Sequence, residues 1–159
     1  MTDTSVRAFT KARCVLGALL AVLMASPPGT LVLAQTVTTN VTKTAGSSTL
    51  VQTLGTARNI RGGDVASSGA GTNLFHSFQD FTIGAGDSVV FTNLTGLGNI
   101  HIADPGGVSN IISRVTGVNP SNIFGNINSS GAFPNASLFL INPHGIVFGA
   151  TASLNVGGS

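Results

Sequence analysis

The apolar residues of this chain fall in short runs that Gly, Asn, Pro and Asp separate. The runs are rich in Val, Ile, Phe and Thr, which is the pattern of β-strands bounded by turns. Residues 62–72 have the composition of a loop, and no stretch shows the period of an amphipathic helix. The predicted strands are Thr49–Leu54, Leu74–Ile83, Ser88–Leu94, Asn99–Ile102, Val108–Val115, Asn122–Ile127, Ser137–Ile141, Ile146–Phe148 and Ser153–Val156.

The even spacing of these runs indicates either a β-sandwich or a β-solenoid. Two features favour the solenoid. Leu138–Ile141 is apolar at adjacent positions, which is typical of strands in parallel or covered sheets. Asn recurs just outside several runs, where it suits tight corners and can bond to an Asn of a neighbouring coil. We expect parallel coils of about 20 residues each.

The clearest local geometry is Asn142–Gly145, which reads Asn-Pro-His-Gly. These are the residues that a type I turn prefers, because Pro presets φ and Gly lets the chain leave the turn. The motif therefore predicts a tight corner between the two flanking strands. We expect those strands to bury Leu140, Ile146 and Phe148, at about 1.5–3 kcal/mol for each side chain.

The amino-terminal segment has a different pattern. Basic residues precede a continuous apolar run over Cys14–Ala25, and a Ser-Pro-Pro-Gly breaker follows it. Basic, apolar and cleavable regions in that order predict a secretory signal peptide over residues 1–34, with the cut between Ala34 and Gln35. A transmembrane anchor and an internal core helix are the alternatives, although the apolar run is short for a hydrocarbon layer about 30 Å thick.

Composition excludes several classes of protein. Charged residues make up only 8% of the 159 residues, and Glu is absent, so the usual surface residues of helix bundles are missing. A single Cys excludes an intramolecular disulfide framework. Acidic and basic side chains balance over residues 35–159, so the expected mature part has no basic patch for nucleic acid.

Three long segments, Gly71–Phe91, Asn110–Gly125 and Leu138–Ser159, together resemble the amino-terminal secretion domain of filamentous-haemagglutinin-like exoproteins. These are the passengers of bacterial two-partner secretion. The resemblance implies a right-handed parallel β-helix with an amino-terminal cap over residues 35–159. It also implies export through the periplasm by the general secretion machinery, then recognition by an outer-membrane β-barrel transporter with POTRA modules. The product would be secreted or held at the cell surface, as a fold-nucleating unit with no catalytic role and no cofactor.

The secretion motif of that family, NPNGI, corresponds to Asn142, Pro143, His144, Gly145 and Ile146. His stands where the family has its second Asn, which bears on any role that needs an amide at this position. The resemblance implies that these five residues carry the secretion signal.

A second family motif, NPNL, has only a weak counterpart in this chain. By position the nearest residues are Asp104 and Pro105, ahead of the NIISRVTG stretch. Asn119–Asn122, which reads Asn-Pro-Ser-Asn, resembles the motif in composition but lies elsewhere in the order of segments. No role is assigned to it.

Two other classes of function stay open. A stand-alone adhesin or binding module would hold its partner with exposed strand edges or loops. A carbohydrate-active β-helix enzyme needs paired carboxylates, and the mature part has only four Asp residues in turn-like surroundings. His76 lies between large apolar neighbours and is expected to be a satisfied strand residue, and the histidines show no metal-ligand spacing. A transporter gene beside this one would favour the secretion function.

The last residues, Ser153–Ser159, keep the strand pattern and lack the polar cap that the end of a solenoid requires. We therefore expect this chain to be the front part of a longer exoprotein or the product of a truncated gene. Contacts with a host or neighbouring cell surface would then belong to the downstream part.

The predicted cleavage site gives a direct test. Amino-terminal sequencing of the exported protein should begin at Gln35 or at its cyclised form, because Val32 and Ala34 fit the positions before the cut. Exported protein that retains residues 1–34 would contradict the signal peptide.

Overall fold

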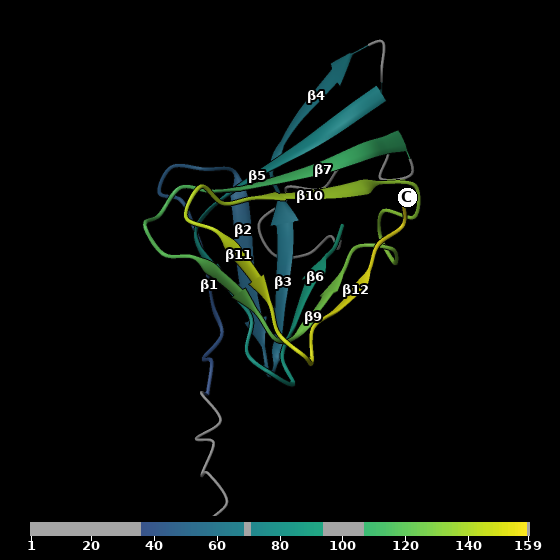
Figure 1. Cartoon of the computed structure of the whole chain (residues 1–159). Helices are drawn as coiled ribbons and strands as arrows, with labels where there is room; N and C mark the ends of the chain where they lie inside the picture. Colours follow the sequence, from purple (N-terminus) through teal and green to yellow (C-terminus); the bar gives the residue numbers. More distant parts are fainter. Residues whose placement is uncertain (1–35, 69–70, 94–106, 159) are drawn as a thin grey trace, which may run out of the picture. The chain divides into compact units, whose positions relative to one another are not determined.

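The computed structural model describes residues 36–68, 71–93 and 107–158 (Figure 1). In these residues the chain forms strands and no α-helix, so the all-β prediction is confirmed. The predicted signal peptide with its Ala34–Gln35 cut, the predicted strand 99–102, and Asp104 and Pro105 lie outside the described residues. The strands are β1 (Asn40–Lys43), β2 (Thr49–Leu54), β3 (Ala57–Gly62), β4 (Asp64–Ser68), β5 (Gly71–Thr82), β6 (Ser88–Phe91), β7 (Val108–Val115), β8 (Ser121–Ile123), β9 (Asn126–Asn128), β10 (Ser137–Ile141), β11 (Ile146–Phe148) and β12 (Ser153–Asn155).

The strands form three sheets, as Figure 1 shows. The first has the order β1-β5-β7-β10, with β4 also paired to β5, the second pairs β11 with β8, and the third has the order β12-β9-β6-β3-β2. The chain visits the sheets in the same sequence several times. We call β7, β8 and β9 the second rung, and β10, β11 and β12 the third rung. The first rung consists of β5, Ile83 and β6, because Ile83 forms a parallel bridge to Ile123 of β8.

Successive rungs pair in parallel. Leu74 of β5 lies opposite Ile111 of β7, which lies opposite Leu138 of β10. β8 pairs with β11, and β9 pairs with both β6 and β12. The predicted parallel pairing is therefore confirmed for the three rungs. The sequence distance from Ile111 to Leu138 exceeds the coil of about 20 residues that the sequence suggested.

The first part of the chain pairs antiparallel. β2 and β3 form a hairpin, β1 lies antiparallel to β5, and β4 folds back on β5. The prediction of a loop over residues 62–72 is thus wrong. Its small and polar residues show no hydrophobic alternation, and the β4–β5 hairpin depends on backbone pairing and on a hydroxyl contact of 3.1 Å between Ser67 and Thr72. The apolar pattern of the sequence also does not predict β1 and β3, because Lys, Arg and Asn residues interrupt the apolar positions of these two strands.

One core cluster joins residues of all three sheets, and its side chains form columns along the stack. In the first sheet Leu74 and Ile111 are buried, and Leu138 packs against them while partly exposed. In the third sheet Val89 and Ile127 are buried one above the other. Each column therefore depends on the register of the backbone pairing between rungs, which places like side chains at the same height.

The third rung is less buried than the sequence predicted. Leu140 and Ile146 are half-buried, whereas Phe148 is 53% exposed, so the prediction that all three side chains are buried is wrong. Within the described residues, β10, β11 and β12 are each paired on one side only, which leaves one flank of their side chains open. Further half-exposed apolar residues of this rung are Phe139, Ile141, Val147 and Leu154.

His76 connects β5 to the edge strand β2 inside the core. It is buried, and its ring centroid lies 5.4 Å from that of Phe91. Its Nδ1 lies 3.3 Å from the hydroxyl of Thr49, so the expectation of a satisfied strand histidine is confirmed. Burial lowers the pKa of His76 from 6.5 to about 4, and the negative charge of Asp64 opposes this shift in part.

We predict that His76 makes the fold sensitive to acid. The unfolded chain takes up the proton near pH 6.5, whereas the pKa of folded His76 is about 4. The stabilising contribution of neutral His76 is therefore complete above pH 6.5 and is lost as the pH falls towards 4, by about 3 kcal/mol in total.

Urea unfolding of the wild type and of His76→Phe across this pH range measures the effect. The variant should lack this part of the pH dependence, while the control His144→Ala should retain it, because His144 is exposed. Equal pH dependence in the wild type and His76→Phe would show that His76 is not responsible.

Candidate functional site

The corner predicted between the strands Ser137–Ile141 (β10) and Ile146–Phe148 (β11) is present. The Gly145 N–H donates to the Asn142 carbonyl oxygen at 3.1 Å, which closes the turn. The Asn142 side chain adds a second bond, because its Oδ1 accepts from the His144 N–H at 2.9 Å. Gly145 has φ of 100°, a left-handed conformation that a residue with a Cβ adopts only with strain. Asn and Gly are therefore both required by the shape of this corner.

Asn142 also attaches the corner to the rung beneath it. Its Nδ2 donates to the carbonyl oxygen of Asn119 and to the hydroxyl of Ser121, each at 3.0 Å. In return, the Ser121 N–H donates to the Gly145 carbonyl oxygen at 3.0 Å. Ser121 is completely buried, so its hydroxyl depends on this partner inside the protein. The two successive corners thus hold each other in register.

Polar contacts continue from this corner towards the start of the stack. Asn119 Nδ2 donates to Asp80 Oδ1 at 2.8 Å, and the Thr42 hydroxyl donates to Asp80 Oδ2 at 3.4 Å. We call Thr42, Asp80, Asn119 and Asn142 the corner ladder. It extends from β1 through β5 to the corners before β8 and β11. A surface row of polar side chains therefore accompanies the buried apolar columns.

The tip of the corner is open to a partner. Pro143, His144 and Gly145 are exposed, whereas Asn142 and Ile146 are half-buried. Ile146 packs against the core cluster. The five residues of the predicted secretion motif therefore lie together but differ in exposure. Two of them anchor the corner, and the other three are accessible to a partner.

Sequence reasoning missed the residues that support the corner. The sequence alone assigns no role to Asn119, Ser121 or Asp80, and Asn119–Asn122 lies outside the family's order of motifs. The structure places Asn119 directly against Asn142. The signal that could have revealed this is the recurrence of Asn-Pro at 119 and 142, each just ahead of a short strand.

The acidic residues of the described part have structural partners. Asp80 accepts the two bonds of the corner ladder, Asp64 accepts from the Ser48 hydroxyl at 2.6 Å, and Asp87 bonds to the Thr39 hydroxyl. Each carboxylate thus joins segments that are far apart in the sequence. Over residues 36–68, 71–93 and 107–158, no three His, Cys, Asp or Glu side chains form a group that suits a metal ion.

These observations define an all-β module of parallel rungs that presents an exposed Asn-Pro corner. The comparison with protein families agrees with this description, because the model of the TPS secretion domain matches residues 34–159. The chain belongs to this family, the secretion domain of two-partner secretion exoproteins. Family membership implies a secreted protein and a cognate outer-membrane transporter as its partner.

No curated protein and no solved structure matches the chain. The part of the chain that the structure describes has no helix long and apolar enough to cross a membrane.

The hydrogen bonds of the corner predict unequal effects of two neighbouring substitutions. Asn142→Ala removes three hydrogen bonds and leaves the buried Ser121 hydroxyl without its partner, so it should lower the free energy of unfolding by about 2–3 kcal/mol. His144→Ala alters an exposed side chain and should change it by less than about 0.5 kcal/mol. Urea unfolding of the two variants measures both values, and equal losses would contradict the anchoring role of Asn142.

Proposed function

We propose that residues 35–159 form a secretion domain that POTRA modules of a cognate outer-membrane transporter recognise in the periplasm. Residues 1–34 would direct the chain to the general secretion machinery and be removed between Ala34 and Gln35. The observation that carries the proposal is the match of the family model to residues 34–159. The domain would act without catalysis, as the export and folding signal of a haemagglutinin-like adhesin.

The corner Asn142–Ile146 is the proposed secretion signal. Its exposed tip supports this assignment, because Pro143, His144 and Gly145 are accessible to solvent. Asn142 would act through the turn, since its amide is already bonded to Asn119 and Ser121. We also propose Asp104 and Pro105 as a weaker second signal, on the basis of the family resemblance alone.

The third rung supports a role in folding of downstream sequence. β10, β11 and β12 stand at the ends of their sheets in the described structure, so their outer backbone groups can pair with another parallel strand. Residues 137–158 contain no Asp, Glu, Lys or Arg, which are the residues that commonly protect an edge against such pairing. We infer that this rung serves as the template on which a right-handed parallel β-helix grows.

Secretion of matched single variants tests the proposed signal. Asn142→Ala and Gly145→Ala should lower secretion strongly, because the first removes the anchoring bonds and the second strains a backbone with φ of 100°. His144→Ala should have a smaller effect, since the His144 side chain is exposed and this residue contributes to the turn through its backbone N–H.

Each variant is expressed with the cognate transporter, and its periplasmic level is measured separately so that loss of export is recognised. If Asn142→Ala and Gly145→Ala leave secretion intact while His144→Ala abolishes it, the turn is not the signal. Position 144 would then be a direct recognition contact.

A further inference from the structure

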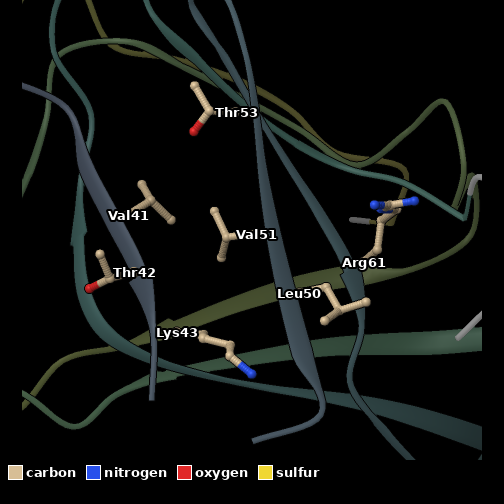
Figure 2. A pocket seen from close by; sticks show the side chains of 7 residues that line it. All are labelled: Val41, Thr42, Lys43, Leu50, Val51, Thr53 and Arg61. Atoms are coloured by element: carbon tan, nitrogen blue, oxygen red, sulfur yellow. The ribbon is translucent and has the colours of Figure 1, made fainter. Parts of the chain in front are cut away.

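A hollow of about 540 Å³ lies between the edge strands β1 and β2, well away in sequence from the corner. Figure 2 shows the seven side chains around it, which come from three strands. Val41, Leu50 and Val51 supply apolar walls, Lys43 supplies a cation, and Arg61 of β3 supplies a second cation. The remaining lining residues are Thr42 and Thr53. Its volume lies in the range of small-molecule sites.

Arg61 is unusual because the Nε atom of its guanidinium is buried without a hydrogen-bond partner. The residue is only 7% exposed, and its Nε has no hydrogen-bond partner and no contact with solvent. A buried guanidinium is costly unless an anion or hydrogen-bond acceptors compensate it. Arg61 lies opposite Leu50 in the β2–β3 hairpin, so the strand register fixes its position beside the apolar wall.

The charges around the hollow have one sign. Lys43 and Arg61 line it, and no carboxylate of the described residues does so. Lys43 Nζ donates only a long, exposed bond of 3.3 Å to the Ser47 carbonyl oxygen. The nearby Asp64 is already bonded to the Ser48 hydroxyl. The lining therefore provides donors and positive charge for an anion while its walls remain apolar.

We propose that this hollow binds a small organic acid, consisting of one carboxylate on a short apolar body. The planar guanidinium of Arg61 suits a carboxylate, which accepts two parallel hydrogen bonds from it. One buried cation balances one negative charge, and the walls formed by Val41, Leu50 and Val51 favour an apolar body over a multiply charged phosphate. The site is independent of the proposed secretion signal.

Titration of the purified protein with octanoate, octanol and acetate tests the site. Binding is followed through the nuclear magnetic resonance signal of the Arg61 Nε–H group and through the melting temperature, which a ligand of the folded state raises. Octanoate should shift the Arg61 signal and raise the melting temperature. Octanol lacks the charge and acetate lacks the apolar body, so each should bind at least about tenfold more weakly.

Three variants distinguish the site from a general effect on the fold. Arg61→Met should weaken octanoate binding about tenfold or more. Without ligand it should melt at the same or a higher temperature, because it removes a buried Nε–H group that has no hydrogen-bond partner. Lys43→Leu should weaken binding by up to about fivefold. Arg58→Leu is the matched control from the same strand, since Arg58 does not line the hollow, and it should bind octanoate like the wild type.

Three results overturn the proposal. If octanoate and octanol bind equally, or if Arg61→Met binds octanoate like the wild type, the hollow does not recognise a carboxylate. If Arg61→Met melts at a clearly lower temperature without ligand, Arg61 already has a partner within the chain and is not available to bind a ligand. If Arg61→Met does not fold, this counts as the same result as a lower melting temperature. The titration of Lys43→Leu with octanoate then still shows whether the hollow binds the carboxylate.

Discussion

The whole structure depends on one constraint, the parallel register between successive rungs. A buried strand must pair its backbone donors and acceptors, and here the partners come from the preceding and following rungs. Once Leu74, Ile111 and Leu138 are placed at the same height, the columns of the core follow. The same register brings the corner at Asn142 next to the corner at Asn119. Core and corner are thus two results of one pairing scheme.

The corner ladder and the apolar core both contribute to fixing that register, in different ways. A slip of two residues along a strand keeps the same face turned inward, so the apolar columns oppose it only weakly, because one aliphatic side chain can replace another. An amide that bonds to a particular carbonyl and a buried hydroxyl does not, since a slip leaves Ser121 without its partner. The antiparallel strands at the beginning add a third element. They place the Thr49 hydroxyl beside His76 of the first rung, and they carry Arg61.

The strands of the second and third rungs could be predicted closely from the sequence, because Val108–Val115, Ser137–Ile141 and Ile146–Phe148 are apolar runs with clear turn residues on both sides. The single run predicted over Asn122–Ile127 is instead two strands. The bend falls at Gly125, where a Cβ would lie 2.3 Å from the Asp87 carbonyl oxygen of the rung beneath. Such a requirement comes from a neighbour distant in the sequence, so no local pattern reveals it. The partners of the Asn142 side chain and the unpartnered Nε atom of Arg61 could not be predicted for the same reason.

The distance along the chain between paired strands has a consequence for the rate of folding. The strand pairs of the rungs join residues more than twenty positions apart, as Ile111 and Leu138 illustrate. A long loop must close before such a bond forms, and proteins built from distant contacts fold slowly compared with those built from local ones. Among the described strands, only the β2–β3 and β4–β5 hairpins can form early from neighbouring residues. Much of the chain therefore stays unfolded for longer than the chain of a helical protein of equal length does. An unfolded chain is the form that a narrow channel can accept.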